Sequence, residues 1–205
     1  HDQGSSLVFD LGGGTFDVAV VGVHQGKPRI WAVDGETQLG GLDWDRRLAD
    51  LLWARLRIDG IDEDAEFDEE FAIRVNSAAE LLKRALTGQA SATARLRHQG
   101  KLLTVTITRT AFEDSTADLV AQCVEAAQRV SDTSRTLRAA PIAQILLVGG
   151  STRMPMIKEA LAAHFGLPVL IHDPDKAVAR GASVLAEKLV AQRPGIRGAS
   201  ERITS

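Results

Sequence analysis

Residues 7–17, Leu-Val-Phe-Asp-Leu-Gly-Gly-Gly-Thr-Phe-Asp, constrain the fold more than any other stretch of the chain. An apolar strand ends at Asp10, three glycines follow, and a second strand begins at Thr15. Glycine accepts positive φ and lets other groups approach its amide, so a glycine turn can present free N–H groups to an anion. Side chains alternate along a strand, so Thr15 and Asp17 share one face. The stretch is either a phosphate and cation site or a glycine hairpin with surface acids.

The composition is that of a soluble globular protein, with 205 residues of which 44% are hydrophobic and 25% charged. The formal net charge of −3 gives no general reason to expect nucleic acid or an anionic membrane as a partner. The single cysteine, Cys123, excludes an internal disulfide and a cysteine zinc cluster. No apolar run is long enough to span a membrane, so we expect a cytoplasmic protein. The abrupt start, without an apolar signal core, suggests a fragment of a longer chain.

Hydrophobic periodicity divides the chain into alternating strands and helices. The expected strands are 7–10, 15–23, 28–34, 90–97, 101–108, 145–148 and 169–171. The expected helices are 43–57, with Asp43 as its N-cap, and 68–87, 110–131, 155–165 and 176–192. This order predicts an α/β core from residues 5–39 plus 109–192, with an inserted α+β subdomain at 40–108. Residues 193–205 are polar, and we expect them to form a mobile tail.

The helix expected at 68–87 has two distinct faces. Its apolar stripe consists of Phe71, Val75, Ala78, Leu82 and Leu86, which keep helical spacing. Glu80, Lys83, Arg84 and Thr87 recur at i, i+3, i+4 and i+7, so they form a polar stripe on the opposite side. Taken alone, the polar stripe is either a solvated helix face or part of a binding site.

A second glycine turn joins the apolar strand 145–148 to a helix. It reads Gly-Gly-Ser-Thr-Arg-Met-Pro over residues 149–155. Pro155 suits the first turn of a helix, and Ser151 or Thr152 could cap that helix. Strand, glycine turn and helix in this order place an anion at a helix N-terminus, although a tight connection without a ligand has the same pattern.

Five segments in the same order resemble motifs of the nucleotide-binding domain of the seventy-kilodalton heat-shock (DnaK-type) chaperones. They are residues 9–18, 39–45, 80–87, 147–155 and 173–182. Each motif alone is weakly or moderately specific, whereas five in register are very specific. The resemblance implies the second lobe of an actin-like ATPase domain, with a ribonuclease H-like α/β core and an inserted α+β subdomain.

The resemblance also implies an ATP or ADP site with Mg²⁺. The implied nucleotide-binding residues are Gly12, Gly13, Gly14, Thr15, Gly40, Gly41, Glu80, Lys83, Arg84, Thr87, Gly149, Gly150, Ser151, Arg153 and Asp175. Asp10 and Asp17 would lie near the cation and its waters, and Asp10, Thr15 and Asp17 would be the catalytic residues. Arg84 and Arg153 would stack on the two faces of adenine.

This sequence departs from the family pattern at four positions. Leu42 stands where the family has glutamate, Trp44 replaces phenylalanine, Asp173 replaces asparagine and Arg180 replaces tyrosine. None of these changes removes a phosphate-binding glycine or a stacking arginine. They suggest a divergent paralogue with different partner contacts.

The resemblance covers only the second lobe of the family's ATPase domain. The first-lobe phosphate loop, lysine and catalytic glutamate have no counterpart here, so we expect the chain alone to hydrolyse ATP negligibly. An intact parent would be an ATPase that couples ATP hydrolysis to protein folding, with a J-domain co-chaperone and a nucleotide exchange factor as partners. Two alternatives share the fold, namely an actin-like filament ATPase and a sugar or acid kinase.

Overall fold

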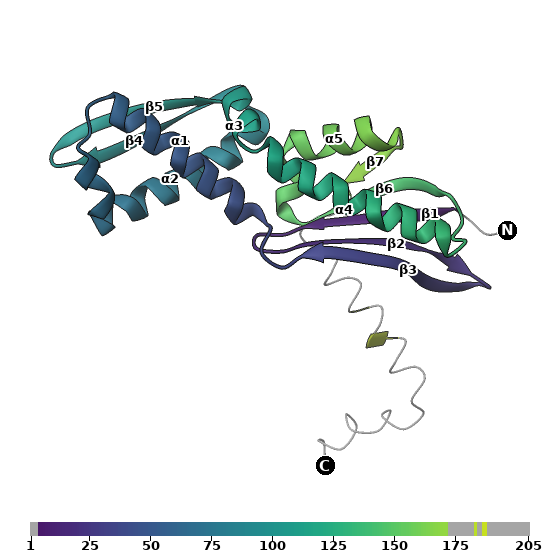
Figure 1. The fold of residues 1–205 in the computed structure, drawn as a ribbon. Coiled ribbons are helices and arrows are strands. Elements are labelled where there is room, and N and C mark those ends of the chain that lie inside the picture. Colours follow the sequence, from purple (N-terminus) through teal and green to yellow (C-terminus); the bar gives the residue numbers. More distant parts are fainter. Residues whose placement is uncertain (1–3, 172–182, 184–185, 188–205) are drawn as a thin grey trace, which may run out of the picture.

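The computed structural model describes residues 4–171, 183, 186 and 187. The described chain forms two units side by side, one around a five-stranded sheet and one around a two-stranded sheet (Figure 1). Its strands, α-helices and 3-10 helices (η) are β1 (Ser5–Leu11), β2 (Phe16–His24), β3 (Lys27–Glu36), α1 (Gly41–Ile58), η1 (Glu63–Phe67), α2 (Glu69–Gly88), β4 (Ser91–His98), β5 (Lys101–Thr108), α3 (Arg109–Ser115), α4 (Ala117–Thr136), β6 (Ile142–Val148), η2 (Gly150–Arg153), α5 (Pro155–Phe165) and β7 (Val169–Ile171). Most of the helix expected at 176–192 and the whole tail at 193–205 lie outside the described residues.

The five-stranded sheet has the order β3-β2-β1-β6-β7. Strands β1 to β3 form an antiparallel meander, whereas β6 runs parallel to β1 and β7 runs parallel to β6. On one face of the sheet, apolar side chains of β1 and β6 are fully buried, as Phe9 and Leu147 illustrate. Helices α4 and α5 pack against the sheet (Figure 1). The mixed sheet with its helices confirms the expected actin-like α/β fold. The predicted division at residues 40–108 stays a prediction.

Helix α1 begins two residues earlier than its sequence pattern suggested. Asp43 is not the N-cap, because the N-cap is Gly40. The Asp43 carboxylate instead accepts a hydrogen bond from the Gly40 amide at 2.8 Å. An acid in the first turn is favourable beside the positive end of the helix dipole, which explains why the residue looked like a cap.

The long helix expected at 110–131 is two helices, α3 and α4, with a break at Thr116. Thr116 is fully buried, and its hydroxyl donates to the Phe112 carbonyl at 2.9 Å. A threonine that bonds back to the preceding turn competes with the helical hydrogen-bond pattern. Hydrophobic spacing alone did not reveal this break, because apolar residues continue on both sides of it.

The smaller unit packs α1 and α2 together against β4 and β5. Phe71, Val75, Leu82 and Leu86 of α2 are buried as expected, whereas Ala79 rather than Ala78 completes the buried stripe. An aromatic group at one end joins three elements: the Phe71 ring lies 5.4 Å from Trp53 and 4.3 Å from His98. No helix in the described part of the chain has the length and apolar character needed to cross a bilayer.

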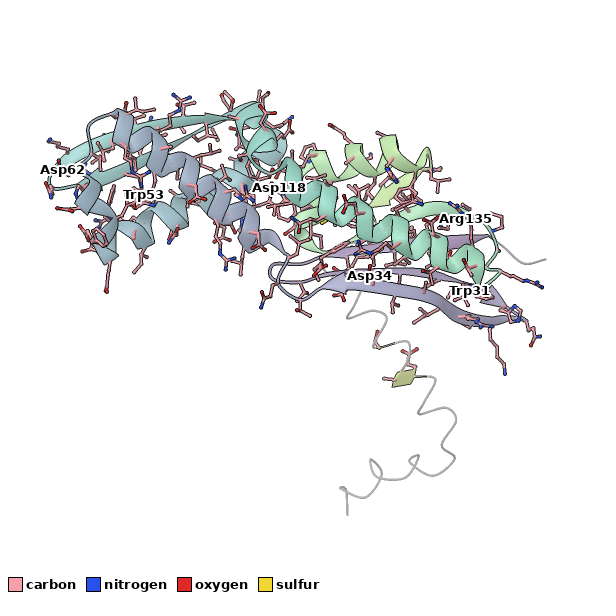
Figure 2. All side chains as sticks on the ribbon, viewed as in Figure 1. Trp31, Asp34, Trp53, Asp62, Asp118 and Arg135 are labelled. Carbon is pink, nitrogen blue, oxygen red and sulfur yellow. The ribbon has the colours of Figure 1, made fainter. Side chains whose placement is uncertain are left out.

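The two units are joined by polar contacts as well as by the chain. The Arg47 guanidinium of α1 pairs with Asp118 of α4 at 2.6 Å and donates to the Ser115 carbonyl at 3.2 Å. Figure 2 shows Asp118 where the units meet. Within the larger unit, Arg129 of α4 pairs with Asp34 of β3 at 2.8 Å.

We predict that Asp68→Ala lowers the free energy of unfolding by about 1 kcal/mol, since Asp68 caps α2. Its carboxylate accepts from the Phe71 amide at 3.1 Å and lies 3.6 Å from His98. Asp64→Ala, at an exposed site in η1, is the control and should change stability by less than about 0.5 kcal/mol. Urea denaturation of the variants measures both values; equal effects would contradict the capping role.

Candidate functional site

Three glycine-containing segments from distant parts of the chain meet at one point. The carbonyl of Gly12 accepts hydrogen bonds from the Gly41 amide at 3.0 Å and from the Ser151 hydroxyl at 2.8 Å. The carbonyl of Gly13 accepts from the Leu42 amide at 2.8 Å. The β1–β2 turn, the start of α1 and the turn after β6 are therefore held together by backbone and hydroxyl donors.

This convergence leaves no room for side chains at the contact points. A Cβ atom on Gly40 would lie 2.6 Å from the backbone N, Cα and C of Gly14. Gly149 has φ of 86°, and a Cβ there would collide with the Leu11 carbonyl. Glycine is therefore required at positions 40 and 149, because any side chain there would prevent contact with the β1–β2 turn and the end of β1. Such close approach is one of the uses of glycine expected from the sequence.

The β1–β2 turn keeps amides available on its outer side. The Gly12 amide donates to the Thr15 carbonyl at 3.0 Å and closes the turn. Within the described part of the chain, the amides of Gly13 and Gly14 make no hydrogen bond. A Cβ on either of these two glycines would meet no atom within 4 Å. Both glycines are exposed, so the turn offers two adjacent N–H groups without a partner among the described residues, the arrangement that can bind an anion.

Asp10 and Asp17 lie directly opposite each other on β1 and β2. Burial, and then the nearby Asp17 carboxylate, raise the pKa of Asp10 above its ordinary value of 3.8. Asp10 also borders the second glycine turn, since a Cβ on Gly149 would lie 2.6 Å from its Oδ1. Phe16 and Val18 are buried while Thr15 and Asp17 are exposed, so the predicted alternation of faces is confirmed.

A pocket of about 580 Å³ opens beside the converging glycines. Its lining consists of Gly13, Gly41, Leu42, Asp45, Glu80, Lys83, Arg84, Thr87, Gly150, Ser151, Arg153 and Met154. The pocket thus joins the polar stripe of α2 to both glycine turns, which lie far apart in the sequence. Gly14 borders a neighbouring pocket of about 610 Å³ at the start of α1. Asp175 falls outside the described residues.

The polar stripe divides into an inner and an outer pair. Lys83 is the inner cation, and its ammonium donates to Asp45 Oδ2 at 2.7 Å and to the Gly41 carbonyl at 2.8 Å. Thr87 donates its hydroxyl proton to the Lys83 carbonyl at 3.1 Å. Glu80 and Arg84 are the outer pair and form an exposed ion pair at 2.5 Å. The exposed guanidinium of Arg84 and the half-buried ammonium of Lys83 are therefore held by different partners.

The turn after β6 differs in detail from its predicted capping pattern. Helix α5 has Pro155 in its first turn, as predicted, but its N-cap is Met154. The Thr152 hydroxyl donates to the Gly149 carbonyl at 2.6 Å, and Ser151 donates to Gly12. The two hydroxyls stabilise the turn and its contact with the β1–β2 turn instead of capping the helix.

Asp45 is the one charged pocket residue that sequence reasoning missed. It lies one helical turn after Gly41, and that i, i+4 spacing places both on the same face of α1. Burial raises the pKa of Asp45, against the lowering effect of Lys83. The spacing was visible in the sequence, but the partner on α2 was not, because 38 residues separate the two.

Comparison with known proteins places the chain in a family. The family model described as "Hsp70 protein" matches residues 1–195. The chain is 38% identical to the chaperone protein dnaK3 of Synechococcus elongatus, over 91% of this chain and 26% of that protein. It is 35% identical to a chaperone protein HscA homolog of Delftia acidovorans, over 91% of this chain and 29% of the relative. A second HscA homolog, from Paracidovorax citrulli, is 37% identical over 94% of this chain and 30% of its own length.

The chain therefore belongs to the Hsp70 protein family. The predicted membership of the heat-shock (DnaK-type) chaperone family is confirmed, and these matches favour it over the filament and kinase alternatives. The chain spans between 26% and 30% of the length of these relatives.

We predict that Gly40→Ala lowers the free energy of unfolding by about 1–3 kcal/mol, because its Cβ would overlap the Gly14 backbone. Gly88→Ala is the matched control at the end of α2, where a Cβ would meet nothing within 4 Å. Because alanine favours helix over glycine, the control should be neutral or stabilising by less than about 1 kcal/mol. Chemical denaturation measures both, and equal destabilisation would argue against a special contact at Gly40.

We predict that Asp17→Asn stabilises the fold at neutral pH. The pKa of Asp10 is raised in the folded protein, so stability falls as pH rises from 3.8 through that raised value. Removing the Asp17 charge reduces this loss. After allowance for solvent screening, the melting temperature at pH 7 should rise by up to about 2 °C. Asp62→Asn, in an exposed loop, should leave it unchanged; a lower melting temperature for Asp17→Asn would refute the repulsion.

Proposed function

We propose that this chain is the second lobe of a chaperone ATPase domain and binds ATP and ADP in the 580 Å³ pocket. One observation carries the proposal: the pocket wall combines two arginines, a half-buried lysine and both glycine turns. These groups match the three parts of a nucleotide, which are a planar base, a sugar and an anionic phosphate chain. The family match supports the same conclusion.

The adenosine end is proposed to lie along α2. Arg84 and Arg153 would stack on the faces of adenine, since planar guanidinium groups pack well on aromatic rings. Glu80 and Lys83 would bind the ribose hydroxyls, and the Thr87 hydroxyl would contact the base. All five residues border the same pocket, which supports this assignment.

The phosphate end is proposed to lie at the two glycine turns. The free amides of Gly13 and Gly14 would donate to the outer phosphates, with the Thr15 hydroxyl beside them. Gly149, Gly150 and Ser151 would border the inner phosphates. We assign Gly12, Gly40 and Gly41 to shaping this end, since their hydrogen bonds and close contacts join the turns. Asp175 is included on its motif alone.

Asp10 and Asp17 are proposed to hold Mg²⁺ through its water molecules. The residues fit a hard cation, because burial and then the opposed Asp17 carboxylate raise the pKa of Asp10, and a cation would relieve the repulsion between the two acids. The described residues contain no group of three or more His, Cys, Asp or Glu side chains that could bind a metal. Mg²⁺ usually keeps several waters and is shared with substrate phosphates, and it would neutralise phosphate charge. Asp10, Thr15 and Asp17 would position water and cation around the reacting phosphate.

The activity of the whole protein is likewise a proposal. We propose that ATP hydrolysis requires groups from a first lobe, and that the full-length protein couples this hydrolysis to protein folding in the cytoplasm. A J-domain co-chaperone and a nucleotide exchange factor would be its partners, and neither nucleic acid nor a membrane would be. Residues 5–39 plus 109–192 would form the core subdomain, and 40–108 the inserted subdomain.

The stacking assignment predicts weaker nucleotide binding when either arginine is removed. Arg84→Ala and Arg153→Ala should each raise the Kd for ATP and ADP about 5- to 30-fold in the full-length protein, measured by titration calorimetry. Arg97→Ala, at an exposed position on β4, is the control and should bind normally. Unchanged affinity in both pocket variants would refute the assignment. A chain of residues 1–205 with the turnover of an intact chaperone ATPase would refute the need for a first lobe.

A further inference from the structure

Asp45 forms an ion pair with Lys83 inside the pocket wall. The Lys83 ammonium lies 2.7 Å from Asp45 Oδ2, and the two side chains are only 14% and 15% exposed. Exposed ion pairs contribute little, whereas solvent and salt screen a partly buried pair such as this one much less. The other ion pair of the pocket, between Glu80 and Arg84, is exposed and therefore more strongly screened.

The second oxygen of Asp45 has an unusual environment. Asp45 Oδ1 is buried and has no hydrogen-bond partner among the described residues. Leaving a carboxylate oxygen dry and unpaired is unfavourable, so stability alone does not account for an acid at this position. An apolar residue would pack between α1 and α2 without this cost, and Leu48 and Leu52 of α1 are in fact fully buried.

The geometry at Lys83 shows what the acid achieves. An ammonium group has three N–H donors. Two of them are used by Asp45 Oδ2 and the Gly41 carbonyl, at 2.7 and 2.8 Å. Lysine is otherwise a flexible side chain with a freely rotating head group. With two donors fixed on α1, one donor remains for a ligand, and Lys83 borders the pocket.

We propose that Asp45 is a positioning residue that holds Lys83 so that its remaining N–H donates to one ribose hydroxyl of the nucleotide. This inference rests on the proposed function, because it assumes that the ribose lies beside Lys83. Asp45 acts through Lys83 and does not itself contact the nucleotide. The positive charge of Lys83 balances the negative charge of Asp45. Burial raises the pKa of Asp45 and Glu80 adds to that rise, whereas Lys83 and Arg84 lower it.

A purely structural role for Asp45 makes a different prediction. If the ion pair only joined α1 to α2, its loss would weaken all nucleotides equally through a distorted pocket. If Asp45 positions Lys83, its loss removes the preference for the particular hydroxyl that Lys83 contacts. The measurement that separates the two is the ratio of Kd for a deoxy analogue to Kd for ATP.

The test uses the full-length protein, with ATP and its analogues that lack the 2′ or the 3′ hydroxyl as probes. Wild-type protein should bind one analogue about tenfold more weakly than ATP, the effect of losing a hydrogen bond to a charged group. Asp45→Asn keeps the shape of the side chain but removes its charge, and should reduce this ratio to about one- to threefold. Lys83→Met should do the same, and the double variant should show no further loss, since the two residues act through one contact.

Asp50→Asn is the matched control, because Asp50 is an exposed acid on the same helix. It should retain the wild-type ratio. Thermal melting of each variant separates misfolding from a specific effect on the ratio. If Asp45→Asn weakens ATP and both analogues equally, or keeps the wild-type ratio, the positioning role is overturned. If wild-type protein binds ATP without any preference for a ribose hydroxyl, this inference fails alone; if it binds no adenine nucleotide, the proposed function fails with it.

Discussion

The contact between the β1–β2 glycine turn and the start of α1 is the interaction on which the rest of the structure depends. The carbonyls of Gly12 and Gly13 accept from the first amides of α1, and Ser151 adds a third donor. Helix N-termini leave four amides without partners inside the helix. Here the partners come from a turn of the other unit, so one set of hydrogen bonds both caps the helix and positions the smaller unit.

This arrangement also determines where an anion can bind. The start of α1 would ordinarily attract a phosphate, but its amides are already used by Gly12, Gly13 and the Asp43 carboxylate. Within the described part of the chain, the donors without a partner are instead the amides of Gly13 and Gly14 in the same turn. The carbonyls of the turn organise the protein, and its amides remain available to a ligand.

Much of the fold could be predicted from the sequence, because burial imposes periodicity on individual elements. The alternation at Phe16 and Val18 and the stripe of α2 were both readable in this way. Competition between side chains and backbone for local hydrogen bonds could not be predicted from hydrophobic spacing. The Thr116 hydroxyl interrupts a helix, and Gly40 rather than Asp43 is the N-cap of α1. The glycine motifs showed that segments approach closely, but not which ones meet.

The site shows the same limit of sequence-based prediction. Residues that share one helix or turn were identified together, but contacts between residues on different elements were not. Helical spacing placed Lys83 on a polar stripe and the family resemblance assigned it to the site, whereas the role of Asp45 became visible only from a contact between α1 and α2. The acids at the two ends of the site therefore differ in a physical sense. Asp45 is neutralised by an internal lysine, as the contact with an uncharged sugar that we propose there would require. Asp10 faces another carboxylate, and in the proposed site a hydrated cation would neutralise this local negative charge.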